Sequence, residues 1–195
     1  MNSVLQKTKR TVSRISWGGD SGQALIEFTL VAVALIVLIF GVIDFCRAIY
    51  LRQLLVNLSR ETANLEARGS GTTTLDIMTN ALGAAILEAK PSLGLNSSTG
   101  MVIVTAVTNF GTHFTISQQY TAGSLAGATS AVGTSTNLGN TAKLPKTAGS
   151  ILPANRTVYV AEIYYKFIPI TPVGNLINHI LLPTRFYDAA YFSAL

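Results

Sequence analysis

The sequence predicts an α+β protein in which a long N-terminal membrane-spanning helix precedes a small helix and an antiparallel β-sheet. Three observations carry this prediction. An apolar run lies near the N-terminus, an apolar stripe with helical spacing follows it, and segments that alternate between apolar and polar residues occupy the C-terminal half. The composition agrees, because 49% of the 195 residues are hydrophobic. Only 12% are charged, against about 25% in soluble domains.

The apolar run covers residues 24–43 and reads ALIEFTLVAVALIVLIFGVI. A helix of this length is roughly 30 Å long, which is enough to cross the hydrocarbon core of a bilayer. Four basic residues and one acidic residue precede the run. The positive-inside rule therefore places residues 1–22 in the cytoplasm. We expect a transmembrane helix at residues 23–43, with the rest of the chain on the opposite side of the membrane.

An export signal and a plain membrane anchor are the ordinary explanations of such a run. A cleaved export signal has a shorter apolar core, of about 7–15 residues, followed by small residues at the cleavage site. Here Asp44, Phe45 and Cys46 follow instead, and Phe45 is too bulky for a lipoprotein site at Cys46. Cys46 is the single cysteine, so no disulfide can form within the chain. A plain anchor stays open, although Glu27 argues against it.

Glu27 is the one charged residue inside the run. A carboxylate at the centre of a membrane helix costs about 2.5–3.5 kcal/mol on insertion scales, and somewhat less near the interface. Such a residue is usually functional and has a partner. If the mature chain began at Gln23, its α-amine would share a helix face with Glu27, four residues further on. In a filament, the amine of one subunit could then neutralise the Glu27 carboxylate of its neighbour.

Two sequence elements carry a resemblance to a known family. The segment Gly22-Gln23-Ala24-Leu25-Ile26-Glu27-Phe28 resembles the processing site of the Flp/Tad branch of type IV pilins. Downstream, Gly41-Val42-Ile43-Asp44-Phe45-Cys46-Arg47 is similar to the G-I-x-[DE]-F-x-R element of TadE-like proteins. The chain departs from the family in two places: Val33 stands where a proline is common, and Cys46 stands where a small residue is frequent.

The resemblance implies a pilin-like fold and a minor pseudopilin that takes part in assembling a Flp/Tad-type pilus in the bacterial inner membrane. It also implies that residues 1–22 are a prepilin leader, which a prepilin peptidase removes by cutting between Gly22 and Gln23. The family-motif residues that it carries over are Phe28, Gly41, Asp44, Phe45 and Arg47. The implied partners are the peptidase, other pilin or pseudopilin subunits, the inner-membrane pilus assembly machinery and membrane lipid.

The helix is expected to continue beyond the membrane as an extracytoplasmic stem at residues 44–68, where an apolar stripe recurs at helical spacing. The stripe consists of Ala48, Leu51, Leu55, Leu58, Thr62 and Leu65. Residues 69–195 are the predicted extracytoplasmic domain. In it we expect a helix at about residues 74–90 and strands at residues 101–108, 113–120, 157–168 and 184–193. Residues 172–183 enclose an apolar run that could be a short helix or a loop, and that could pack in the core or dock a partner.

Residues 121–150 are almost all Gly, Ala, Ser, Thr and Asn. Such a stretch has little apolar area with which to offset the entropy lost on ordering, so we expect a long surface loop. Adhesion or glycan attachment is an alternative role for it.

The sequence predicts no catalytic residue, no metal site and no cofactor. His113 and His179 have no partner at metal or triad spacing. Phosphate-binding glycine motifs and the G-x-S-x-G elbow are missing. Much of the net charge of +5 lies before the apolar run. The predicted domain therefore has little excess of basic residues with which to form a nucleic-acid-binding face. The alternative function is a membrane-tethered binding or adhesion module that is not processed, and a membrane-anchored enzyme comes third.

Overall fold

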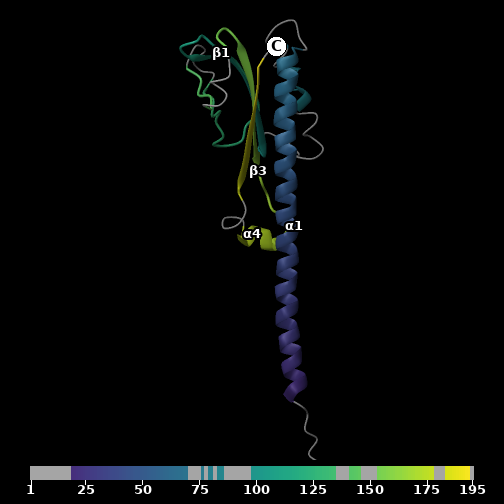
Figure 1. Ribbon diagram of the computed structural model, residues 1–195. Coiled ribbons are helices and arrows are strands. Elements are labelled where there is room, and N and C mark those ends of the chain that lie inside the picture. Colours follow the sequence, from purple (N-terminus) through teal and green to yellow (C-terminus); the bar gives the residue numbers. More distant parts are fainter. Residues whose placement is uncertain are drawn as a thin grey trace, which may run out of the picture. The chain divides into compact units, whose positions relative to one another are not determined.

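The computed structural model describes residues 19–69, 76, 79–80, 83–85, 98–134, 141–145, 153–177 and 183–193. These residues include a long helix, a four-stranded sheet and a short helix (Figure 1). The chain divides into two compact units, Met1–Ile39 and Phe40–Leu195. The predicted α+β fold, with its long N-terminal apolar helix and its antiparallel sheet, is confirmed.

Helix α1 spans Gly19–Arg68. From Gly22 to Ile43 almost every residue is exposed, and the most apolar stretch has a mean hydropathy of 2.8. By length and composition this helix could cross a membrane. From Asp44 onward one face of α1 is buried. Its apolar members are Ala48, Leu51, Leu55, Leu58 and Ala63. The predicted stripe is therefore confirmed, except that Leu65 is only half-buried.

The sheet contains β1 (Gly100–Asn109), β2 (Phe114–Gly123), β3 (Thr157–Lys166) and β4 (Arg185–Ser193). The strand order is β2-β1-β3-β4, and every neighbouring pair is antiparallel. Valine, isoleucine, threonine and tyrosine dominate the two central strands, as their preference for a pleated, half-buried surface predicts. All four predicted strands are present, with ends that differ by a few residues.

Both faces of the central strands are buried. On one face, alternate residues of β1 and β3 pack against the stem of α1. They are Val102, Val104, Ala106, Tyr159, Ile163 and Tyr165, joined by Phe186 of β4. On the other face, Val107, Val158 and Val160 pack against Val132 and Ala142. The alternation predicted for the C-terminal half thus gives β3 one face in the core, but the opposite face of β3 is buried as well.

The described part of residues 121–150 differs from the predicted long surface loop. Its first residues complete β2, and Leu125, Val132 and Ala142 are buried. Thr141 forms an isolated bridge with Thr115 of β2. A few well-spaced apolar side chains therefore seat this stretch on the sheet, although its average composition is that of a loop. Residues 135–140 and 146–150 lie outside the described part.

A buried carboxylate from β3 also holds this stretch. Glu162 accepts hydrogen bonds from the backbone N–H of Ala131, at 2.8 Å, and from the Ser130 hydroxyl. The Tyr187 hydroxyl donates to the same carboxylate at 3.0 Å. Burial, followed by the nearby Glu162 charge, raises the pKa of Tyr164 to about 12. Polar anchoring of this kind comes from a distant strand, so the composition of residues 121–150 does not reveal it.

Two predicted elements are described only in part. Of the helix expected at about residues 74–90, residues 76, 79–80 and 83–85 are helical, and Ala85 is buried in the core. The segment at residues 172–183 begins as helix α4, Pro172–Ile177. Residues 178–182 lie outside the described residues, so the choice between core and docking surface for the apolar run stays a prediction.

Candidate functional site

Helix α4 is attached to α1 through its first turn. Thr171 occupies the N-cap position and Pro172 the first helical position, which are the favoured places for these residue types. The Thr171 hydroxyl accepts a hydrogen bond from the backbone N–H of Gly174 at 2.9 Å and donates in turn to Oδ2 of Asp44. Oδ1 of Asp44 accepts from the backbone N–H of Ile170 at 3.1 Å. Asp44 thus joins the stem to the residues that connect β3 with α4.

Arg47 makes a second attachment one helical turn further on. Its Nη1 donates to the carbonyl oxygen of Ile168 at 2.6 Å. Its guanidinium carbon lies 5.6 Å from the ring centroid of Phe167, within cation–π range. Phe167 is buried and packs edge-on against Phe186. Arg47 therefore secures the same connection from the side of the hydrophobic core.

Gly174 is required by the closeness of this packing. A Cβ added at Gly174 would lie 1.8 Å from Oδ2 of Asp44 and 2.6 Å from Cβ of Pro169. No side chain fits without movement of α4 or of the stem. We call Asp44, Arg47, Ile168, Ile170, Thr171 and Gly174 the stem clamp. Its sequence signal is the Thr171-Pro172 pair, which is a recognisable helix start; nothing in the sequence indicates that Asp44 is its partner.

The predicted processing and pairing residues lie on the exposed part of α1. Nε2 of Gln23 donates to Oε1 of Glu27 at 3.0 Å, and both side chains are exposed. Phe28 is 71% exposed. A Cβ added at Gly22 would meet nothing within 4 Å, so the fold does not require glycine there. This part of the chain leaves Glu27 accessible to another molecule.

The family-motif residues fall into two groups. Asp44 and Arg47 belong to the stem clamp and bind the chain's own domain. Phe28 and Phe45 are exposed, and an added Cβ at Gly41 would meet nothing within 4 Å. The structure therefore gives an intramolecular role to the two charged motif residues and leaves the two aromatic ones facing outward.

Glu66 is a buried carboxylate that the sequence analysis missed. Both of its oxygens are buried and accept no hydrogen bond within the described structure. Burial raises the pKa of Glu66 well above its ordinary value. Burial and, after it, the Glu66 charge also raise the pKa of Tyr159, which faces the same core. The available signal was spacing, because Glu66 follows Leu58 and Thr62 on one helix face.

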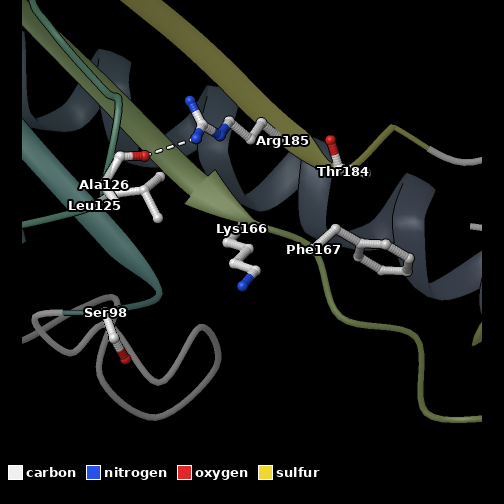
Figure 2. A pocket seen from close by; sticks show the side chains of 7 residues that line it. All are labelled: Ser98, Leu125, Ala126, Lys166, Phe167, Thr184 and Arg185. Atoms are coloured by element: carbon white, nitrogen blue, oxygen red, sulfur yellow. Dashed lines mark hydrogen bonds between the residues drawn. The ribbon is translucent and has the colours of Figure 1, made fainter. Parts of the chain in front are cut away.

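A hollow of about 370 Å³ lies beside the end of β3 and the start of β4 (Figure 2). It is lined by Ser98, Leu125, Ala126, Lys166, Phe167, Thr184 and Arg185. The Arg185 guanidinium donates to the carbonyl oxygens of Ala126, at 2.6 Å, and Gly127, at 2.9 Å, so it holds that turn in place. The lining contains no acid, histidine or cysteine. Among the described residues, no group of three His, Cys, Asp or Glu side chains could hold a metal ion.

Comparison with known proteins points to one family. The family model of TadE-like proteins matches residues 22–64. The match covers both sequence elements that carry the resemblance and confirms it. It indicates a function related to the Tad pilus and an association with pilus-assembly components, and the apolar helix is consistent with membrane anchoring. No curated protein and no solved structure matches the chain.

Proposed function

We propose that the chain is a minor pseudopilin of a Flp/Tad-type pilus, with a structural rather than an enzymatic role. The observation that carries this proposal is the contrast along α1. Before Asp44 the helix exposes an apolar surface and the Glu27 carboxylate, and from Asp44 onward it binds its own domain. One part of the helix is thus free for lipid and neighbouring subunits, while the other carries the domain.

In this proposal a prepilin peptidase cuts between Gly22 and Gln23 at the cytoplasmic face of the bacterial inner membrane. The basic residues of the leader support this orientation through the positive-inside rule. Gly22 supports the cleavage site, because the fold itself makes no use of a glycine there. A protease that accepts only a small residue gives a physical reason for the glycine. The domain beyond Asp44 would lie in the periplasm or at the cell surface.

Assembly would then use the charge at Glu27. Gln23 and Glu27 share a helix face, since their side chains hydrogen-bond at 3.0 Å. After cleavage, Gln23 would carry an α-ammonium group close to the level of this carboxylate. The pairing partners would be the α-ammonium group of one subunit and the carboxylate of the next. Attraction between them is stronger in the low dielectric of a membrane than in water. Partners in the pilus would be other pilin or pseudopilin subunits and the inner-membrane assembly machinery.

The intact mass of the protein from its native membrane tests the processing step. We expect a chain that begins at Gln23 when the peptidase is present and a full-length chain when it is deleted. Gly22→Val should block the cut and leave membrane insertion unchanged, because its side chain meets nothing in the fold. Gly22→Ala is the matched control and should still be cut.

Two results would count against the proposal in different ways. A full-length N-terminus in the presence of the peptidase would contradict processing and favour the unprocessed membrane-tethered binding module. A mature chain whose Gln23 has cyclised with loss of ammonia would contradict only the charge pairing, because it has no α-ammonium group.

A further inference from the structure

The connection between β3 and α4 has one buried side and one exposed side. Phe167, Pro169 and Thr171 are buried, whereas the alternate residues are exposed. The exposed residues are Lys166, Ile168, Ile170 and Pro172. Ile168 is 48% exposed and Ile170 is 64% exposed. Among the residues outside α1 whose burial the structure describes, they are the only large aliphatic side chains exposed to this degree.

The stem clamp fixes the position of these isoleucines along the helix axis relative to Ile43, the last residue of the apolar run. Arg47 binds the carbonyl oxygen of Ile168, and Asp44 binds the N–H of Ile170. The apolar run ends at Ile43, and at about 1.5 Å per residue Arg47 lies about 6 Å further along the helix. The headgroup layers of a bilayer add roughly 5–8 Å on each side of its hydrocarbon core. A bilayer whose hydrocarbon core ends at Ile43 would therefore have its headgroups at the level of Ile168 and Ile170.

We propose that the outward side of residues 166–172 is a second membrane contact, in which Ile168 and Ile170 enter the boundary between headgroups and acyl chains. Lys166 fits this placement, because it is exposed and its ammonium group projects away from the Arg185 guanidinium (Figure 2). A lysine at this level can reach lipid phosphates while its alkyl stem stays in apolar surroundings. Continuity with the membrane span favours lipid as the occupant over another subunit.

Such a contact would restrain the domain. A domain carried by one helix can rotate and tilt about the end of the span, whereas a second contact beside the helix limits both motions. Subunits presented in a fixed orientation lose less freedom when they associate. The inference goes beyond the proposed pilus role and rests only on α1 crossing the membrane.

Lipid-borne quenchers test the contact in the full chain. Cys46→Ser first removes the natural thiol, which is exposed. Single cysteines at Ile168→Cys, Ile170→Cys, Val33→Cys and Phe110→Cys then carry an environment-sensitive fluorophore. Each protein is placed, at few copies per vesicle, in phosphatidylethanolamine and phosphatidylglycerol containing a nitroxide near the headgroup or deep in the acyl chain. Phe110 is the matched control, because it is 55% exposed and follows β1 at the opposite end of the sheet from Lys166.

We expect a blue shift and strong quenching by the shallow nitroxide at positions 168 and 170, quenching by the deep nitroxide at position 33, and neither at position 110. Quenching at 33 without quenching at 170 would overturn the inference and leave the proposed pilus function untouched. A blue shift at 170 without lipid quenching would mean contact with protein, and would overturn it equally. Protease resistance equal to that of the unlabelled chain confirms that each variant is folded.

Discussion

Glu27 and Asp44 are carboxylates on the same helix with opposite surroundings. Asp44 is buried and bonded to the backbone of Ile170 and the hydroxyl of Thr171. Glu27 is exposed, and the hydrogen bond that the structure gives it comes from the Gln23 amide. Both lie in the range that matches the TadE-like family. A charged residue in one family motif can therefore serve the chain's own fold, while a charged residue in the neighbouring motif stays accessible to other molecules.

Glu66, further along the helix, sharpens the comparison. It is as buried as Asp44 but accepts no hydrogen bond within the described structure. A buried carboxylate without partners is costly in its charged form, so it takes up a proton more readily. Substitution of these three carboxylates of α1 should therefore have three different effects on the stability of the domain. Loss of Asp44 should destabilise it, loss of Glu66 should stabilise it at neutral pH, and loss of Glu27 should leave it unchanged.

Asp44→Ala should have the largest effect. It removes the acceptor of two donors at the start of α4, and a buried donor left without a partner costs about 1–3 kcal/mol. We expect the free energy of unfolding to fall by on the order of 3 kcal/mol, measured by chemical unfolding of the full chain in detergent micelles. Glu61→Ala, at an exposed position of the same helix, is the control and should change nothing measurable. Equal stabilities of the two variants would show that the stem clamp does not hold the domain.

Gly174→Ala should have the next largest effect on the free energy of unfolding, because the new methyl group would overlap Asp44 and Pro169. Overpacking of this kind typically costs about 1–3 kcal/mol. Gly41→Ala is the matched control, since its Cβ meets nothing and alanine favours a helix. The double variant Asp44→Ala, Gly174→Ala should lose less than the sum of the single variants, because the nearest clashing atom is gone. Full additivity would contradict the direct contact between α4 and the stem.

Glu66→Leu should have a smaller effect of opposite sign. Because the pKa of Glu66 is raised in the folded state, the folded protein keeps the proton on Glu66, whereas the unfolded protein loses it above the ordinary glutamate pKa of about 4.5. Stability should therefore fall as the pH rises above that value. Glu66→Leu removes this pH dependence and should stabilise the domain by about 1–2 kcal/mol at pH 7. The measurement is unfolding of both proteins from about pH 4 to about pH 8, a range that begins below the ordinary pKa of a glutamate. An unchanged pH slope in the variant would contradict the assignment to Glu66.

Much of the fold was predictable because local patterns report it. The apolar run, the stem stripe and the four strands each repeat with the period of their secondary structure. The stem clamp was not predictable, because Asp44 and Thr171 are far apart in the sequence and meet only in the folded chain. The packing of residues 121–150 on the sheet was not predictable for the same reason. Glu162, on a strand distant in the sequence, accepts the hydrogen bonds that hold this stretch. The two family elements could be recognised from the sequence, because each is a short continuous segment and both lie within α1.

Glu27→Ala tests the central claim most directly, because it should leave the fold intact and abolish assembly. In cells that make the pilus, pilus formation and subunit crosslinking are compared between wild-type, Glu27→Ala and Glu27→Gln proteins at matched membrane levels. Domain unfolding is measured alongside. We expect unchanged unfolding and unchanged or slightly better membrane insertion, since a charge has been removed from the bilayer. Pili and crosslinks should be lost with both variants. Normal pili and unchanged crosslinks at normal protein levels would contradict the account.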